Sequence, residues 1–262
     1  MSAPRGPLLF ITGASSGIGQ ALALEWARRG GRLALVARRG DELRAWAAAQ
    51  DLGADRCAVF PADVRDVASI TAAGRACLDT LGLPDVVIAN AGISVGVDIG
   101  IASDLEVLRS IWETNNLGLA ATFQPFVRPM CDARRGTLVG VASVAGIRGL
   151  PGHAGYSSSK AGVIAFCESL RGECRPFGVH VATIVPGYID TPLTQENRYS
   201  MPFLMPADRF AAKALDAIAA RARYRVIPWQ MGVVAKLLRA LPDAVYDRVL
   251  AGRPRKHRAD GS

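Results

Sequence analysis

The stretch Leu8-Leu-Phe-Ile-Thr-Gly-Ala-Ser-Ser-Gly-Ile-Gly19 joins an apolar run to a glycine-rich turn. Leu8–Thr12 is typical of a strand buried on both faces, and a helical pattern over about Gly17–Arg29 follows the turn. Glycines at such a junction let the backbone turn tightly and approach a phosphate group near the free N–H groups of a helix N-terminus. Ordinary strand-to-helix turns also carry glycines, so the position after the first strand is the feature that favours a nucleotide site.

Short apolar runs alternate with longer helical stretches along the whole chain. The predicted strands are Leu8–Thr12, Arg32–Ala37, Arg56–Pro61, Val86–Ala89, Thr137–Ala142, Val179–Val185 and Tyr224–Pro228. The predicted helices are Gly17–Arg29, Asp41–Asp51, Val67–Leu81, Leu105–Asp132, Tyr156–Phe177, Ala207–Ala222 and Val233–Leu250. Strands that are apolar nearly throughout belong in parallel sheets covered on both faces. The order predicts an α/β fold of Rossmann type, with a doubly wound parallel sheet of about seven strands and helices on both faces.

The composition favours a single domain. The chain has 262 residues, of which 50% are hydrophobic and 21% charged, so it can bury a sizeable core. No repeat or low-complexity linker interrupts the alternation, and we expect residues 1–262 to form one domain. The longest stretch without an assigned element is about 187–206, and a loop of that length in a compact domain is usually functional.

The formal net charge of +8 raises the question of a nucleic-acid partner. The basic residues are scattered, apart from a terminal cluster at Arg253–Arg258, and no aromatic residues are interleaved with that cluster. We therefore interpret the cluster as a solvated tail and expect no nucleic-acid partner. Nucleic-acid binding through this tail is the minor alternative, and it would show a steep salt dependence.

Cysteine usage and the first residues indicate the compartment. The cysteines are Cys57, Cys77, Cys131, Cys167 and Cys174. Their number is odd and they lack Cys-x-x-Cys spacing, so we expect no disulfide framework and no metal site. Met1–Pro7 runs straight into the first strand without a secretory signal, and no stretch offers about twenty consecutive apolar residues for a transmembrane segment. These features favour a soluble protein of the reducing cytoplasm.

The turn Thr12-Gly-Ala-Ser-Ser-Gly-Ile-Gly19 resembles the Thr-Gly-x-x-x-Gly-x-Gly fingerprint of the short-chain dehydrogenase/reductase family. In that family the turn holds the pyrophosphate of a nicotinamide dinucleotide. The resemblance implies cofactor contacts from Gly13, Ser15, Ser16, Gly17, Ile18 and Gly19. Further motifs follow in the family's order, so the resemblance extends from about Leu8 to Thr191.

The end of the second predicted strand indicates which dinucleotide is bound. An NAD-binding site of this type usually places an acidic side chain there to accept from the ribose 2′-hydroxyl, but Ala37 occupies that position. Arg38 follows, and its planar guanidinium suits bidentate recognition of a 2′-phosphate. We therefore expect NADP(H) to be favoured over NAD(H). The alternative is that Arg38 and Arg39 only form a solvated strand end.

Three later segments resemble the family's remaining cofactor motifs: Ala62-Asp-Val64, Asn90-Ala-Gly92 and Pro186-Gly-Tyr-Ile-Asp-Thr191. The resemblance implies that Asp63 contacts the adenine amine, and that the Ile189 backbone and the Thr191 hydroxyl hold the nicotinamide carboxamide. Asp63 could instead cap a helix, and Asn90 could simply hold a turn. The implied contacts are Asp63, Val64, Asn90, Ala91, Gly92, Pro186, Gly187, Ile189 and Thr191.

Tyr156 and Lys160 have the spacing of one helical turn, which places both side chains on one face of a helix. A phenol with a pKa of about 10 exchanges protons poorly at neutral pH, but a nearby ammonium and an oxidised nicotinamide both favour tyrosinate. The pair alone is often only a surface pair. In the family it is the catalytic centre, and both residues also touch the cofactor.

Two upstream residues complete the catalytic set that the resemblance implies. Ser143 ends a predicted strand thirteen residues before Tyr156, the separation that the family uses, and its hydroxyl can hold the substrate oxygen. Asn115 begins an Asn-x-x-Gly motif with Gly118, which assigns the motif to Asn115 and not Asn116. In the family this asparagine lies in a distorted helix and binds a water that connects the lysine to solvent.

The resemblance implies an NAD(P)-dependent oxidoreductase acting on CH–OH or C=O groups. We expect NADPH-linked carbonyl reduction, or oxidation of a secondary alcohol, with the catalytic residues Asn115, Ser143, Tyr156 and Lys160. The expected substrate is an apolar, fairly large small molecule. The alternative from another class is a non-catalytic NADP(H)-binding sensor or scaffold protein. Family members usually assemble, so we expect a homodimer or homotetramer through the predicted helices Leu105–Asp132 and Tyr156–Phe177.

The substrate is expected to be covered by the variable part of the chain. Residues 187–206 form the expected substrate loop, and a helical segment over about 229–252 follows. Met201–Pro206 and Trp229–Leu241 carry methionines and bulky apolar groups that suit a lid over an apolar substrate. A subunit interface is the second reading of the C-terminal helix, and contact with a membrane surface ranks last.

Overall fold

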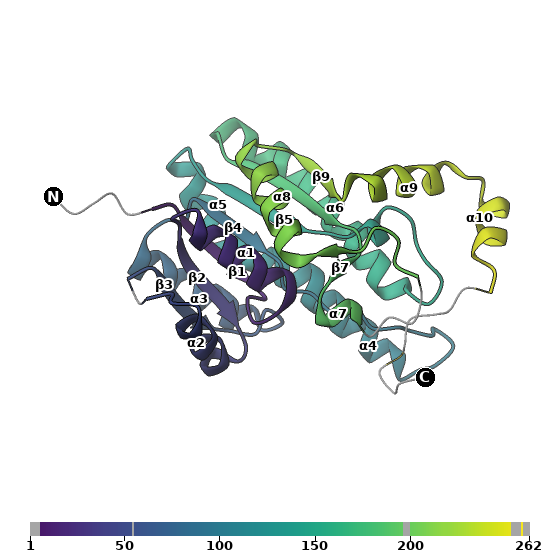
Figure 1. Ribbon diagram of the computed structural model, residues 1–262, viewed down its shortest axis with the longest axis horizontal. Helices are drawn as coiled ribbons and strands as arrows, with labels where there is room; N and C mark the ends of the chain where they lie inside the picture. Colours follow the sequence, from purple (N-terminus) through teal and green to yellow (C-terminus); the bar gives the residue numbers. More distant parts are fainter. Residues whose placement is uncertain (1–5, 54, 196–199, 253–257, 259–262) are drawn as a thin grey trace.

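The computed structural model describes residues 6–53, 55–195, 200–252 and 258 (Figure 1). Its main sheet has seven strands, all parallel, in the order β3-β2-β1-β4-β5-β6-β9. The strands are β1 (Leu8–Thr12), β2 (Arg32–Ala37), β3 (Cys57–Pro61), β4 (Val86–Ala89), β5 (Thr137–Val141), β6 (His180–Pro186) and β9 (Tyr224–Ile227). The predicted doubly wound parallel sheet is confirmed, and each strand end lies within one residue of its prediction.

Helices cover both faces of this sheet (Figure 1). They are α1 (Gly17–Arg28), α2 (Gly40–Ala49), α3 (Val67–Leu81), α4 (Asp104–Trp112), α5 (Gly118–Asp132), α6 (Ala154–Cys174), α7 (Pro192–Gln195), α8 (Ala207–Ala219), α9 (Trp229–Ala240) and α10 (Asp243–Leu250). Helices α1, α2 and α8 pack on one face of the sheet, where Phe210 is fully buried. Helices α3, α5 and α6 pack on the other, where the rings of Phe10 and Phe126 lie 4.7 Å apart.

Two long predicted helices are interrupted in the structure. The helix predicted over Leu105–Asp132 divides at a π-helical turn, η1 (Glu113–Leu117), which confirms the distortion that the family resemblance implied at Asn115. The helix predicted over Val233–Leu250 is wrong in extent, because α9 begins at Trp229 and ends before Pro242. Proline cannot donate to the preceding turn and disfavours a helical conformation in the residue before it, so the chain bends there and restarts as α10.

The stretch 187–206 is more ordered than the expected loop. It contains β7 (Ile189–Asp190), the short helix α7 and β8 (Met205–Pro206), while residues 196–199 lie outside the described part. Strands β7 and β8 pair in parallel with Ile189 opposite Met205, and both side chains are buried. Two-residue strands give too short a pattern for prediction from periodicity. None of the described helices is both long and apolar enough to span a bilayer.

Arg148 holds the C-terminal helices to the body of the protein. Its guanidinium donates to the carbonyl oxygens of Arg239 at 2.8 Å and Leu241 at 2.9 Å, and it pairs with Asp243 at 2.8 Å. It also stacks 3.9 Å from the ring centroid of Tyr246. One side chain thus satisfies carbonyl groups at the C-terminal end of α9 and pairs with the first residue of α10.

The expectation of a solvated tail at Arg253–Arg258 is wrong for Arg258, whereas residues 253–257 lie outside the described part. The Arg258 guanidinium binds the buried Asp104 carboxylate through two hydrogen bonds of 2.8 Å. That guanidinium and the Asp98 N–H hold the pKa of Asp104 at about 2. The sequence offered no signal for this pair, because the partners are far apart along the chain.

The strand order determines where a ligand can bind. The chain leaves β1 toward β2 and β3 on one side, and toward β4, β5, β6 and β9 on the other. The strand order therefore reverses between β1 and β4. In open α/β sheets a crevice forms at this point, outside the carboxyl ends of the strands.

Replacing Arg148 by Met is expected to lower the free energy of unfolding by about 2–3 kcal/mol, because two helix-end carbonyls and a carboxylate lose their donor. Only 11% of the Arg148 side chain is exposed. Arg128 is a matched control, because its side chain is 84% exposed and pairs only along α5 with Asp132. Arg128→Met should change stability by less than about 0.5 kcal/mol. Equal urea midpoints for the two variants would contradict this anchoring role.

Candidate active site

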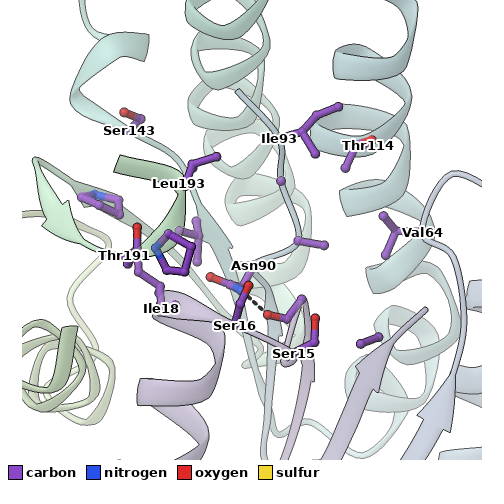
Figure 2. A pocket seen from close by; sticks show the side chains of 18 of the residues that line it. Ser15, Ser16, Ile18, Val64, Asn90, Ile93, Thr114, Ser143, Thr191 and Leu193 are labelled. Carbon is purple, nitrogen blue, oxygen red and sulfur yellow. Dashed lines mark hydrogen bonds between the residues drawn. The ribbon is translucent and has the colours of Figure 1, made fainter. Parts of the chain in front are cut away.

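A cleft of about 490 Å³ opens at the carboxyl ends of the central strands. Figure 2 shows Ser15 and Ser16 on one side of this cleft and Ser143 on the other. The predicted site residues that line it are Gly13, Ser15, Ser16, Gly17, Ile18, Arg38, Asp63, Val64, Asn90, Ala91, Gly92, Ser143, Tyr156, Lys160, Pro186, Gly187, Ile189 and Thr191. Two predicted residues, Gly19 and Asn115, lie behind its wall.

The glycine-rich turn between β1 and α1 lies against the end of β4. Gly13 has a φ of 68°, and a Cβ there would lie 2.8 Å from the Cα of Ala91. Gly19 has a packing role, since a Cβ on it would overlap the carbonyl of Gly13. The side chain of Ser16, the residue before α1, makes no capping hydrogen bond in the described structure. The first N–H groups of α1 are therefore available to an anion, which fits a pyrophosphate.

Asn90 fastens the end of β4 to this turn. Its side-chain amide donates to the carbonyl oxygens of Thr12 at 3.0 Å and Gly13 at 3.2 Å, and its backbone N–H donates to Thr12 Oγ1 at 3.2 Å. The alternative that Asn90 only holds a turn therefore describes these contacts well. Asn90 also lines the cleft, so holding the turn and bordering a ligand are compatible.

The other end of the cleft is rich in arginine. Arg39 pairs with Glu42 at 3.1 Å, whereas Arg38 has no carboxylate within salt-bridge distance among the described residues. Asp63 pairs with Arg65 at 2.8 Å, and the hydrogen bond from Arg65 lowers the pKa of Asp63. The reading of Asp63 as a helix cap is wrong, because Asp66 accepts from the first N–H groups of α3. Arg65 lines the cleft and was missed by the sequence analysis.

Ser143, Tyr156 and Lys160 converge on the cleft from β5 and α6. Ser143 ends β5 and begins a short 3₁₀ turn, η2 (Val144–Gly146), where its hydroxyl accepts from the Ala145 N–H at 3.2 Å. Lys160 is buried, and its ammonium donates to the Val141 carbonyl at 2.8 Å and lies 5.9 Å from the ring centroid of Tyr156. The three polar groups expected from the sequence are therefore adjacent in space.

Burial dominates the electrostatics of this cluster. It raises the pKa of Tyr156, although a hydrogen bond with Ser143 opposes the shift, and it lowers the pKa of Lys160 to about 8. The expectation that Lys160 helps to lower the pKa of Tyr156 is therefore not met by the protein's own groups. The reason is that burial disfavours the charged phenolate.

Asn115 connects α6 to the segment after β4. This side chain is 1% exposed, accepts from the Ile93 N–H at 2.9 Å, and donates to the Ile93 carbonyl at 3.0 Å and to Ser159 Oγ at 2.9 Å. A Cβ on Gly92 would lie 3.2 Å from both Asn115 Oδ1 and Lys160 Nζ. Asn115 therefore lies near Lys160 but behind the cleft wall, where it positions the residues that line the cleft.

Several lining residues had no sequence signal of their own. They are Val36, Arg39, Ala62, Arg65, Ile93, Thr114, Val141, Ala142, Pro192, Leu193 and Thr194. Most directly precede or follow a predicted site residue, so extending each motif by one or two positions would have found them. Thr114 was quoted beside Asn115 but given no role.

Comparison with known proteins gives matches over most of the chain. The family model for short chain dehydrogenase matches residues 8–201. An uncharacterized oxidoreductase of Myxococcus xanthus is 38% identical over 239 residues, which cover 91% of this chain and 94% of the relative. The structure of a short-chain dehydrogenase from Sphingobium yanoikuyae in complex with NADPH is 25% identical, with a TM-score of 0.78, and covers 97% of this chain and 99% of its own.

A further structure, a short chain dehydrogenase/reductase from Burkholderia phymatum in complex with NAD, has a TM-score of 0.80 at 22% identity. It covers 98% of this chain and 99% of its own. At that identity the likeness concerns the fold alone. The two solved structures hold different nicotinamide dinucleotides, so the fold by itself does not select between them.

Asn115→Ala is expected to lower the free energy of unfolding by roughly 2–4 kcal/mol, because it leaves both backbone groups of Ile93 unpaired in a partly buried position. Asn116→Ala is the matched control. Asn116 donates once, to the Ser159 carbonyl at 2.8 Å, and its amide oxygen finds no partner among the described residues. Its loss should cost about 1 kcal/mol. Urea denaturation measures the loss of stability for both variants. A larger loss for Asn116→Ala than for Asn115→Ala would show that the motif has been assigned to the wrong asparagine.

Proposed function

Because the chain belongs to the short-chain dehydrogenase family, an oxidoreductase family, we propose that it is an NADP(H)-linked enzyme that reduces carbonyl groups or oxidises secondary alcohols. The observation that carries this proposal is the adjacency of Ser143, Tyr156 and Lys160 at the wall of the cleft. The phenol can exchange a proton with a substrate oxygen, and the serine hydroxyl can hold that oxygen in place.

The cleft fits a nicotinamide dinucleotide. We propose that the N-terminus of α1 and the turn at Gly13–Gly19 hold the pyrophosphate, while Asp63, Val64 and Asn90–Gly92 border the adenosine half. Pro186, Gly187, Ile189 and Thr191 would hold the nicotinamide half, with Lys160 on the ribose hydroxyls. When bound, the nicotinamide supplies or accepts the hydride.

The protein's own residues handle the proton. In the reducing direction, Ser143 and Tyr156 donate hydrogen bonds to the carbonyl oxygen, and Tyr156 then gives up its proton to that oxygen. The raised pKa of Tyr156 keeps the phenol protonated at neutral pH, which suits a proton donor. Asn115 would keep Lys160 in place and provide its route to solvent.

The cofactor preference rests on charge at the end of β2. Ala37 lines the cleft where an NAD-selective site would carry a carboxylate, and the neighbouring Arg38 has no carboxylate partner among the described residues. A free guanidinium at this position suits a 2′-phosphate. Bound NADPH in the relative from Sphingobium yanoikuyae is compatible with this preference.

The remaining expectations extend the proposal to the whole chain. We propose one catalytic domain over residues 1–262, located in the cytoplasm, with an apolar small-molecule substrate. Trp112, Leu117 and Phe166 on α4, η1 and α6 are 49%, 49% and 38% exposed. These side chains support a homodimer or homotetramer through the helices expected from the sequence.

Tyr156→Phe is expected to lower kcat for ketone reduction by a factor of about 10² to 10⁴, because no other group offers a proton at that position. Affinity for NADPH should stay close to that of the wild type. Ser157→Ala is the matched control, because the buried Ser157 hydroxyl has no partner among the described residues and lies outside the cleft wall. NADPH absorbance with a panel of ketones gives the rates. Near-normal turnover by Tyr156→Phe would remove Tyr156 from the chemistry.

Arg38→Asp is expected to lower the ratio of kcat/KM with NADPH to kcat/KM with NADH by about 10- to 100-fold, because a charge-assisted contact to the 2′-phosphate becomes a repulsion. Arg44→Asp makes the same change of charge on α2, where Arg44 pairs with Asp41 and does not line the cleft. That control should leave the ratio unchanged. An unchanged ratio for Arg38→Asp would show that another group selects the cofactor.

A further inference from the structure

One side of α9 is apolar and exposed to solvent. Trp229, Val233 and Leu237 are 69%, 47% and 64% exposed and follow one another at four-residue spacing. That spacing places them in a row along the helix, which we call the α9 stripe. Met231 and Ala235 are buried on the other side, so α9 already packs against the body through a separate apolar face.

The α9 helix is basic as well as apolar. Helix α9 itself has no Asp or Glu and carries two exposed cations, Lys236 and Arg239. Lys236 is three residues after Val233 and directly precedes Leu237, so it lies beside the stripe. The α9 stripe is therefore apolar, with cations beside it and no acidic residue on the same helix. Such a face is complementary to a partner that has an apolar interior and negatively charged groups at its surface.

We propose that the α9 stripe and these cations dock the protein on the surface of an anionic phospholipid bilayer, with α9 lying in the plane of the interface. Trp229 would sit at headgroup level, Val233 and Leu237 would enter the acyl boundary, and the cations would face lipid phosphates. This inference rests on the proposed function and deepens it, because an apolar carbonyl substrate would then be taken from the lipid phase.

Charge argues against a second copy of the chain as the occupant of this face. A two-fold contact through the α9 stripe would bring Lys236 and Arg239 of one subunit close to the same two residues of the other. No acidic residue on α9 could offset that repulsion. An anionic bilayer turns the same charges into an attraction.

Helix α9 contacts residues that lie in or near the candidate active site. Met231, on the buried side of α9, packs against Gly187, where a Cβ would lie 2.7 Å from Met231 Cγ, and Gly187 lines the cleft. Arg148, five residues after Ser143, binds the carbonyl of Arg239 near the end of α9. Figure 1 shows α9 and α10 at the end of the molecule opposite α2 and β3. Docking would therefore hold the Gly187 side of the cleft toward the lipid.

Vesicle flotation with the full-length protein tests the proposal. The wild type is expected to float with vesicles of phosphatidylcholine and phosphatidylglycerol, and much less with phosphatidylcholine alone or in about 1 M salt, where charges are screened within about 3 Å. Trp229→Ser/Leu237→Ser should reduce the bound fraction about tenfold or more. Lys236→Gln/Arg239→Gln should weaken binding to anionic vesicles by about fivefold per cation.

Val67→Ser/Phe177→Ser is the control, because these side chains are 43% and 44% exposed and lie outside the α9 stripe. It should float like the wild type. A wild type that stays unbound to anionic vesicles, or equal binding by the stripe variant, overturns the proposal. A fall in assembly mass of the stripe variant in light scattering would assign the face to a contact between copies. NADPH turnover with a short soluble ketone, measured on the same samples, tests the proposed function separately.

Discussion

The architecture of the site depends on the close approach between the turn after β1 and the end of β4. Gly13, at a φ of 68°, leaves no room for a Cβ against Ala91, and the side-chain amide of Asn90 closes the contact on Thr12 and Gly13. The same contact lies where the strand order reverses, so the crevice that binds ligands in such sheets opens beside the N-terminus of α1. A larger residue at Gly13 or Gly19 would separate these elements, because each Cβ would meet backbone atoms as well as the side-chain amide of Asn90.

Desolvation governs the other end of the cleft. The ammonium of Lys160 is buried with one carbonyl partner from β5, and the phenol of Tyr156 is placed where its charged form is disfavoured. Burial raises the pKa of Tyr156 and lowers the pKa of Lys160 to about 8, so it disfavours the charged form of both groups. Asn115 supports the arrangement from behind through Ile93 and Ser159, and the π-helical turn is what directs its side chain there. Residues on β5, α6 and η1 therefore act together to position the Ser143, Tyr156 and Lys160 side chains.

The sequence alone was sufficient to predict the features that follow a periodic pattern or carry a family motif. Apolar runs predicted all seven main strands within a residue, and every predicted site residue except Gly19 and Asn115 lines the cleft. Features that depend on tertiary contacts were missed. The pairing of Arg258 with Asp104 joins residues that are far apart in the sequence. The β7–β8 pair is too short to give a periodic pattern. The place of Arg65 in the site becomes clear only from its ion pair with Asp63 in the folded protein. The raised pKa of Tyr156 also differed from expectation, because spacing along a helix gives proximity but no measure of burial.

The proposed function requires that the protein catalyses hydride transfer from NADPH to a carbonyl group, which a sensor or scaffold that only binds the cofactor would not do. The most direct measurement mixes the purified full-length protein with NADPH and a panel of apolar ketones, and follows both NADPH absorbance and the alcohol formed. The account predicts that at least one ketone is reduced, with one alcohol formed for each NADPH consumed. Saturable binding of NADPH, seen by its fluorescence, without alcohol from any member of the panel would contradict it and favour a sensor or scaffold.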